Sequence, residues 1–500
     1  MVFNLKRQVK MTHSLSRREF LRKTSATSAA IVLPSVVSQA AANAGRGKRP
    51  NLVFVFPDQF RRQAIGCMGQ DPVITPRLDR FASESMVLTD AFSSYPVCSP
   101  FRAMLFTGKY PISNGVTTNC NSASDVMLRQ DQRCFTDILG DAGYSVGYLG
   151  KWHLDKPHEP FVGRRRGRVG GPGGGIVWDE FVPSERRHGI GFWHAYNCRD
   201  QHMNPRYWTT DAGRTKPTYF NQWSTEHEAD VAIDFIHNSK GKHRDPDKPF
   251  ALFISPNPPH TPFDQVPKKY VDMYEGKSYR DLLNRPNVDI DRPHPVARQH
   301  VKNYFAAVTG TDEQFGRILD ALDKRGLTDN TIVVFTADHG EMMGSHNRMH
   351  KGVSHEESAG IPFIIRWPGR IPARRDDLLL SPADMMPSLL GLMGLASRLP
   401  YDVEGRDCSS VMLGKVGTRP TSALYLRCAG PRGGSRGVRT HRYTFAVTPK
   451  ENGGEETLLF DNKMDPYQLR NVAESQPEVV RKLTAELQRW LDKTKDPWKV

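Results

Sequence analysis

The sequence lacks the patterns that mark several common classes of protein. It has no internal repeat, no Cys-x-x-Cys pair and no Cys/His spacing typical of a structural zinc site. No nucleic-acid-binding module accompanies its formal net charge of +15. An apolar run at residues 29–37 contains Pro34 and is much shorter than the roughly 20 residues that span a bilayer. We therefore expect neither a nucleic-acid partner nor a permanent membrane span.

Cysteine is also scarce, with seven residues in a chain of 500. Because seven is odd, at least one cysteine has no intramolecular disulfide partner. A chain of this length buries a sizeable core without disulfides. For Cys98, which begins a helix-like stretch, the residues alone leave four roles open: a packed thiol, half of a disulfide, a metal ligand or a nucleophile.

Residues 1–44 have the features of an export signal. They carry seven Lys or Arg and one acidic residue. The paired arginines within Ser16–Lys23, the apolar run and the small residues at 41–44 resemble a twin-arginine signal with its cleavage site. We expect the twin-arginine export machinery to translocate the chain, so that a mature protein beginning near Gly45 is periplasmic or secreted.

Continuous apolar stretches of strand length alternate with helix-like segments along the rest of the chain. Buried strands separated by helices are typical of an α/β fold, in which helices cover both faces of a mostly parallel central sheet. The predicted strands are Asn51–Pro57, Tyr144–Gly150, one beginning at Phe250, Thr331–Ala337 and Pro362–Trp367, and the predicted helices are 75–85, 224–238 and 301–325.

The same patterns predict two parts of unequal size. Residues 45–390 form the predicted α/β domain, and residues 158–220, which show little periodicity, are predicted to be an exposed loop insertion. Further on, the strand-like pieces are shorter, as at Tyr443–Val447, and an amphipathic helix begins near Pro477. Residues 391–500 are therefore predicted to form a small C-terminal α+β subdomain.

Polar side chains follow four of the predicted strands, and the carboxyl ends of parallel strands meet at one edge of a sheet. Taken singly, an Asp in such a position is more often a helix cap, and a lone His a satisfied surface or core group. Together, two carboxylates, an amide oxygen and an imidazole suit calcium or magnesium. Lys151, Lys351 and Arg102 suit a tetrahedral oxyanion. The residues at the strand ends are Asp58, Gln59, Lys151, His153, His260, Asp338 and His339.

Several motifs resemble one family of enzymes. The stretch Cys98–Arg102, CSPFR, fits the Cys-x-Pro-x-Arg motif of the formylglycine-dependent (type I) sulfatases, which belong to the alkaline-phosphatase-like superfamily. Further motifs of that family occur in the family's order between about residues 49 and 475, among them GYLGKWHL, SPNPPHTPF and TADHGEMMGSH. The resemblance covers nearly all of the predicted mature chain and implies an alkaline-phosphatase-like α/β fold.

The resemblance implies a fifth role for Cys98. In the family, a maturation enzyme oxidises this cysteine to Cα-formylglycine, and one hydroxyl of the hydrated aldehyde attacks the sulfur of a sulfate ester. The second hydroxyl then expels sulfate as the aldehyde re-forms, a step that a serine lacks. The implied activity is hydrolysis of sulfate esters. We expect a sulfated carbohydrate as substrate, because export and the basic segment Arg164–Arg168 favour an anionic molecule outside the cytoplasm.

The resemblance also implies roles for the other site residues. Arg102 holds the diol of residue 98 in place, and Lys151 and Lys351 bind the sulfate oxygens. His260, alone or with Lys351, is the general acid for the leaving alcohol, and His153 is the base that collapses the hemiacetal. The implied ligands of one calcium ion, with magnesium as the less suitable metal, are Asp58, Gln59, residue 98 (Cys98), Asp338 and His339.

Three positions depart from the common pattern of the family. Gln59 and His339 stand where many members have Asp and Asn, and Phe101 stands where many have Ser or Thr. The Asp-Gln and Asp-His variants also occur in members that hydrolyse phosphonates or phosphate diesters. A phosphodiesterase or phosphonate monoester hydrolase is therefore the main alternative. A non-catalytic binder of sulfated glycans, with Cys98 unconverted, is an alternative of another class.

Overall fold

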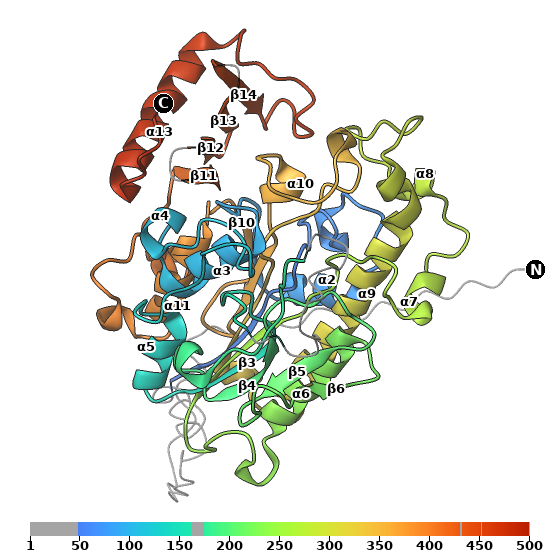
Figure 1. Cartoon of the computed structure of the whole chain (residues 1–500), viewed down its shortest axis with the longest axis vertical. Coiled ribbons are helices and arrows are strands. Elements are labelled where there is room, and N and C mark those ends of the chain that lie inside the picture. Colours follow the sequence, from blue (N-terminus) through green and yellow to red (C-terminus); the bar gives the residue numbers. More distant parts are fainter. Residues whose placement is uncertain (1–48, 160, 162–174, 431–432, 452, 500) are drawn as a thin grey trace, which may run out of the picture. The chain divides into compact units, whose positions relative to one another are not determined.

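The predicted export signal at residues 1–44 and the basic segment Arg164–Arg168 lie outside the residues that the computed structural model describes (Figure 1). Among the described residues, no helix is long and apolar enough to cross a membrane. The described residues are 49–159, 161, 175–430, 433–451 and 453–499.

The main sheet is centred on β1 (Asn51–Val55), which lies between β7 (Phe250–Ser255) and β8 (Thr331–Thr336) and runs parallel to both. Every residue of these three strands is buried, which explains why their sequences are continuous apolar runs. β3 (Ser145–Lys151) pairs parallel with β7 on the far side from β1. The carboxyl ends of four neighbouring strands therefore lie at the same edge of the sheet.

The sheet has ten strands and is mostly parallel, as predicted. Its other strands are β2 (Met86–Leu88), β4 (Phe192–Tyr196), β5 (Arg206–Thr209), β6 (Thr218–Tyr219), β9 (Phe363–Arg366) and β10 (Arg374–Asp376). The order is β10-β2-β9-β8-β1-β7-β3-β4-β5-β6. β9 is antiparallel to β8 and β2, and β5 is antiparallel to β4 and β6, so the sheet is mixed at both flanks.

Helices cover both faces of this sheet, as predicted (Figure 1). On one face, α9 (Pro295–Lys324) packs against α2 (Pro76–Ser83) and α6 (Ser224–His237). On the other face, α3 (Cys98–Thr107) packs against α11 (Pro382–Leu392). The remaining helices of this part are α4 (Pro111–Asn114), α5 (Phe135–Asp141), α7 (Lys268–Asp272), α8 (Tyr279–Leu282), α10 (Glu356–Ala359) and α12 (Ser409–Met412).

The C-terminal residues form a second, smaller sheet that is antiparallel throughout and carries one long helix. Leu487 and Trp490 of this helix, α13 (Pro477–Thr494), pack with Leu424 and Val438 of the sheet. The predicted C-terminal α+β element is confirmed, while its boundary near residue 390 stays a prediction. The strands are β11 (Ser422–Ala429), β12 (Gly433–Thr440), β13 (Tyr443–Pro449) and β14 (Glu455–Asp461).

Residues 176–220 differ from the predicted exposed loop. They include β4, which pairs parallel with β3 and extends the main sheet, and β5 and β6, which continue it. Four of the five residues of β4 are buried. The prediction failed because these strands are short and because β4 and β5 place Trp, His and Tyr side chains inside, whereas the central strands are rich in Val and Ile.

Candidate active site

The polar residues at the strand ends come together with one residue of α3. Asp58 follows β1, Asp338 follows β8, and Lys151 is the last residue of β3. Lys151 Nζ lies 2.8 Å from Asp58 Oδ2, and Arg102 Nη2 lies 3.2 Å from the same oxygen. Arg102 Nη2 also lies 3.0 Å from Asp338 Oδ2. All four side chains are completely buried, so two basic groups and two carboxylates neutralise one another away from solvent.

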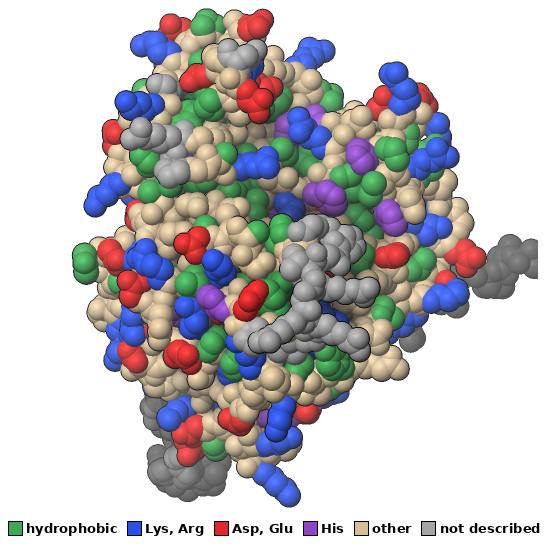
Figure 2. Space-filling view, viewed as in Figure 1, with side chains coloured by type: hydrophobic (Ala, Val, Ile, Leu, Met, Phe, Trp, Pro, Cys, Tyr) green, Lys and Arg blue, Asp and Glu red, His purple; other side chains and the backbone are tan. Residues whose placement is uncertain are grey.

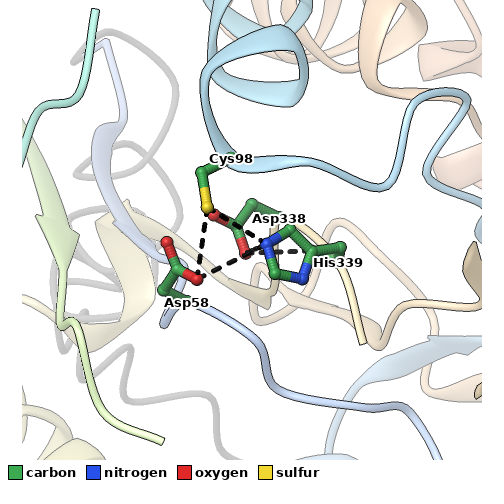
Figure 3. A group of neighbouring side chains, drawn as sticks. All are labelled: Asp58, Cys98, Asp338 and His339. Atoms are coloured by element: carbon green, nitrogen blue, oxygen red, sulfur yellow. Dashed lines mark hydrogen bonds and ion pairs between the residues drawn. The ribbon is translucent and has the colours of Figure 1, made fainter. Parts of the chain in front are cut away.

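Cys98 is the first residue of α3, and its side chain points into this group (Figure 3). Its Sγ lies 3.3 Å from His339 Nε2, 3.6 Å from Asp58 Oδ1 and 3.8 Å from Lys151 Nζ. Burial and the Asp58 carboxylate raise the pKa of the Cys98 thiol to about 12, so the unmodified side chain is a protonated, weak nucleophile. All seven cysteines lie in the described residues as free thiols, so Cys98 is not half of a disulfide.

Asp58, Cys98, Asp338 and His339 could together hold a metal ion, because one ligand atom from each lies within 4.8 Å of the others (Figure 3). Burial would raise the pKa of Asp58, but Lys151 and His260 hold it well below its usual value. Burial and the charge of Asp58 raise the pKa of Asp338 to about 7. Two carboxylates this close and this deeply buried repel each other, and a divalent cation between them would relieve that repulsion. The two carboxylates therefore fit a hard cation, whereas the Cys98 thiol would fit one only after its conversion to an oxygen donor.

Gln59 also lies at the site, with its amide already engaged. Its Oε1 accepts a hydrogen bond of 2.5 Å from Lys351 Nζ, and its Nε2 donates to Glu341. Its backbone N–H donates to Asp338 Oδ1 at 3.1 Å. Gln59 has φ of 62°, in the left-handed region, and this turn directs the N–H towards the carboxylate. The structure thus places Gln59 between the predicted metal ligands and Lys351.

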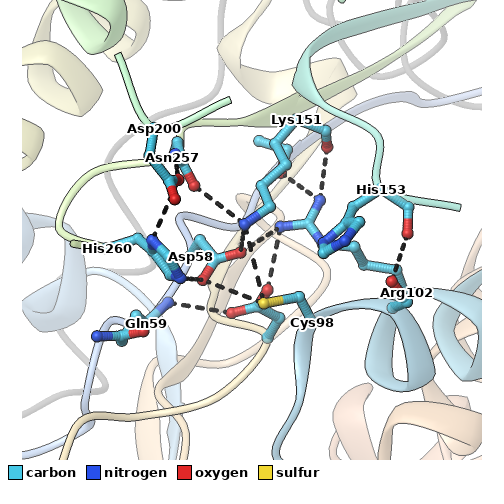
Figure 4. Close-up of polar contacts among 12 residues, drawn as sticks. Asp58, Gln59, Cys98, Arg102, Lys151, His153, Asp200, Asn257 and His260 are labelled. Carbon is cyan, nitrogen blue, oxygen red and sulfur yellow. Dashed lines mark hydrogen bonds and ion pairs between the residues drawn. The ribbon is translucent and has the colours of Figure 1, made fainter. Parts of the chain in front are cut away.

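His260, which lies beside Asp58 (Figure 4), forms a pair with Lys351. Lys351 Nζ lies 2.9 Å from His260 Nε2, which is itself 4.0 Å from Asp58 Oδ1. His260 Nδ1 lies 2.7 Å from the backbone oxygen of Thr261, to which it donates. This bond fixes the ring and leaves Nε2 facing the site. The arrangement suits two groups that bind an anion and deliver a proton.

His153, two residues after Lys151, is also buried and lies near Arg102 (Figure 4). Ser99 Oγ donates to the backbone oxygen of His153 at 2.6 Å, which ties the start of α3 to this residue. His153 Nε2 lies 3.2 Å from the backbone oxygen of Cys120, so the proton belongs on Nε2. Nδ1 has no hydrogen-bond partner among the described residues. Burial and Lys151 lower the pKa of His153 well below its usual value, so the ring is a neutral acceptor.

Two residues of the site were missed by the sequence predictions. Asn257 Oδ1 accepts a hydrogen bond of 3.1 Å from Lys151 Nζ, and Asn257 Nδ2 donates to Asp200 Oδ1 at 3.0 Å (Figure 4). Asp200 Oδ1 also lies 3.5 Å from His260 Nδ1. Asn257 stands three residues before His260 in the same motif and could have been found there. Asp200 stands in the segment that was predicted to be a loop.

Phe101, for which the sequence offered no reason, packs in the main hydrophobic core. All ten residues of α3 are buried, and membership of the core means that the Phe101 ring lies among apolar neighbours. A phenyl ring at this position stabilises the helix that carries Cys98 and Arg102.

Positively charged and titratable groups gather around the site. Figure 2 shows His side chains near the middle of the face in view, next to Lys or Arg side chains. Burial lowers the pKa of His350, and the nearby Lys351, His260 and His294 lower it further. An approach lined with such groups suits an anionic substrate.

Comparison with known proteins identifies the family. Residues 50–395 match the sulfatase family, and residues 344–496 match the C-terminal region of N-sulphoglucosamine sulphohydrolase. The first match covers more than half of the chain. The chain therefore belongs to the sulfatase family and is a hydrolase of sulfuric esters, as the motifs around Cys98 implied.

Two relatives and one solved structure match over most of their length. An endo-4-O-sulfatase of Bacteroides thetaiotaomicron is 40% identical over 489 residues, covering 91% of this chain and 94% of the relative. An ulvan-active sulfatase of Formosa agariphila is 34% identical over 464 residues, covering 90% of this chain and 83% of the relative. A solved structure from work on glycosaminoglycan metabolism by Bacteroides thetaiotaomicron has a TM-score of 0.84 and 39% identity, and covers 90% of this chain and 97% of that chain.

Proposed function

We propose that the protein hydrolyses sulfate esters of a sulfated carbohydrate, with formylglycine made from Cys98 as the nucleophile and calcium as the cofactor. The observation that carries this proposal is the position of Cys98 at the start of α3, among two carboxylates, Arg102 and Lys151. The names of the endo-4-O-sulfatase and the ulvan-active sulfatase support a carbohydrate substrate. The high pKa of the Cys98 thiol supports the need for its conversion.

Each of the remaining residues has a task that its position supports. Lys151 and Lys351 bind the sulfate oxygens, and Arg102 orients residue 98 from one helical turn away. His260 Nε2, beside Lys351, donates the proton to the leaving alcohol. His153 Nδ1 accepts a proton from the second hydroxyl of the diol, which would also satisfy this buried atom.

Asp58, Asp338 and His339 would hold the calcium ion together with residue 98. Gln59 would join them with its amide oxygen once that oxygen releases Lys351 Nζ. Bound calcium would neutralise sulfate oxygens and lower the pKa of the diol. Oxygen-rich sites with irregular geometry favour calcium over magnesium, which demands a nearly ideal octahedron.

Calcium is expected to stabilise the protein. At a free concentration of 100 times the dissociation constant, it should raise the free energy of unfolding by about 2.7 kcal/mol. Thermal melts of metal-free protein with and without calcium measure this effect, and chelation should abolish sulfate release reversibly. Asp338→Asn should lose the stabilisation, whereas Asp131→Asn, a change at an exposed ion pair, should keep it. Equal melting temperatures with and without calcium would argue against the metal site.

The choice between ester classes is tested by comparing aryl sulfates with aryl phosphate diesters. We expect kcat/KM of the matured enzyme to be higher for the sulfates. A higher value for the diesters would favour the phosphodiesterase or phosphonate hydrolase alternative. Binding of a sulfated glycan by wild type and by Cys98→Ala, with no turnover by either, would favour the non-catalytic binder. Release of sulfate from a panel of sulfated mono- and polysaccharides then identifies the sugar.

Export and maturation belong to the same proposal. The paired arginines within Ser16–Lys23 and the small residues at 41–44 support export by the twin-arginine machinery to the periplasm or the medium. The motif Cys98–Arg102 supports a formylglycine-generating enzyme as a further partner. N-terminal sequencing of exported protein tests the first point: a start near Gly45 is expected, and an intact N-terminus would contradict cleavage.

A further inference from the structure

A pocket of about 440 Å³ lies next to the active site and shares a wall with it. Asp200, which lines the pocket, is the residue whose carboxylate contacts His260 and Asn257 (Figure 4). The backbone oxygen of Arg199, which also lines the pocket, accepts a hydrogen bond of 3.1 Å from Asn257 Nδ2. The segment between the pocket and the site is therefore fixed by the same asparagine that contacts Lys151. We call this cavity the Arg199 pocket; it is lined by residues 176–179 and 198–201, Arg206 and Tyr219.

Two exposed aromatic side chains line the Arg199 pocket. Trp178 is 38% exposed and Tyr219 is 57% exposed. The Trp178 ring also packs against the ring of His153, with 5.9 Å between their centroids. Trp178 therefore connects the pocket to the catalytic centre. Aromatic faces at the surface of a pocket bind the apolar faces of sugar rings, and their exposure is otherwise unfavourable.

The charge of Arg199 is not compensated by any described carboxylate within ion-pair distance. Its Nε is buried and has no hydrogen-bond partner among the described residues, and its guanidinium lies 5.9 Å from the centre of the Tyr219 ring. Burial and the neighbouring Arg206 lower the pKa of Arg199, which means that the site disfavours the positive charge as it stands. An anion beside Arg199 would reverse that effect.

The two acids of the Arg199 pocket are already engaged. Asp179 Oδ2 forms an ion pair of 2.5 Å with Arg206 Nη2 and is largely buried. Asp200 contacts His260 and accepts a hydrogen bond from Asn257. Neither acid forms an ion pair with Arg199, so the guanidinium is available to an incoming ligand.

We propose that the Arg199 pocket binds the sugar adjacent to the one that carries the scissile sulfate, and that Arg199 binds an anionic substituent of that adjacent sugar. This inference rests on the proposed function and narrows the substrate to a polyanionic glycan. The substituent is a carboxylate or a second sulfate, since both offer oxygens to a guanidinium fork. Trp178 and Tyr219 supply the surface on which the adjacent ring lies.

The test compares ratios of kcat/KM within each protein variant. One substrate pair is a sulfated hexosamine–uronate oligosaccharide and its carboxyl-reduced form. The other is the same carboxyl-reduced oligosaccharide with and without a second sulfate on the adjacent sugar. Wild type is expected to prefer the anionic member of one pair by about tenfold. Arg199→Gln should abolish that preference, and Arg199→Lys should keep part of it. Arg129→Gln, at an exposed ion pair elsewhere, should keep all of it.

A ratio of two kcat/KM values does not depend on how much of the protein is folded. A misfolded fraction lowers the apparent kcat/KM for both substrates of a pair by the same factor. Loss of the carboxylate preference in Arg199→Gln identifies a uronate as the adjacent sugar, and loss of the sulfate preference identifies a second sulfate. The inference is overturned if wild type shows neither preference, or if Arg199→Gln retains the wild-type ratios. If wild type releases no sulfate from any of these substrates while its folded state is intact, the proposed function itself fails.

Discussion

Replacing Cys98 with alanine is expected to lower kcat/KM for sulfate release by about 10⁴-fold or more, the scale seen when a covalent nucleophile is removed. The reason is positional: residue 98 is the group at the start of α3 that the carboxylates, Lys151 and Arg102 surround. The other residues would still bind the sulfate but would have nothing with which to attack it. Steady-state sulfate release from an aryl sulfate measures the effect.

Two further variants make the Cys98 result specific. Cys67→Ala removes a half-buried thiol that is not one of the site residues, and it should leave turnover within about twofold of wild type. Cys98→Ser offers one hydroxyl where the diol has two, so at most a single turnover is expected. Full multiple turnover by Cys98→Ala would show that residue 98 is not the nucleophile.

Arg102→Ala is expected to lower the free energy of unfolding by about 3 to 5 kcal/mol, the usual effect of breaking a buried ion pair. Arg102 Nη1 donates to the backbone oxygen of Lys151 at 2.6 Å and to Ser255 Oγ at 2.7 Å, while Nη2 contacts Asp58 and Asp338. Without the guanidinium, Asp58 would keep its ion pair with Lys151, whereas Asp338 would lose its ion pair with arginine. Urea unfolding followed by tryptophan fluorescence measures the change.

The control for Arg102→Ala is a substitution at an arginine whose ion pair is exposed to solvent. Arg129→Gln breaks such a pair with Asp131, and its effect should stay below about 1 kcal/mol. Arg102→Lys keeps the positive charge but loses the planar guanidinium. Its decrease in the free energy of unfolding should therefore lie between the decreases for Arg129→Gln and Arg102→Ala. An unfolding midpoint of Arg102→Ala equal to that of wild type would contradict the described role of this residue.

Much of the main sheet was predictable from the sequence because its strands are buried on both faces. Predicted strands at Asn51–Pro57 and Thr331–Ala337 correspond to β1 and β8, and the predicted helix at 301–325 is the C-terminal part of α9. The direction of the flanking strands was not predictable. β9 is as apolar as its neighbours, yet it runs antiparallel, and hydrophobicity carries no information on direction.

The prediction of a loop around β4 was wrong for a related reason. A strand of five residues that includes Trp, His and Tyr has no clear period, so it was assigned to a loop. That error concealed Asp200, which lies just after β4 at the same edge of the sheet as Lys151. Most of the candidate site could be predicted because its residues follow recognisable strands. Contacts that depend on side-chain direction, such as Gln59 with Lys351 and Asn257 with Asp200, required the fold.

The most direct test of the proposed mechanism is the chemical state of residue 98. Protein coexpressed with a formylglycine-generating enzyme is digested with trypsin, and the mass of the peptide Phe81–Arg102 is measured. The mass of a peptide with formylglycine at residue 98, in a preparation that releases sulfate, is the expected result. A peptide that retains the intact thiol while the preparation turns over sulfate esters at full rate would contradict the mechanism.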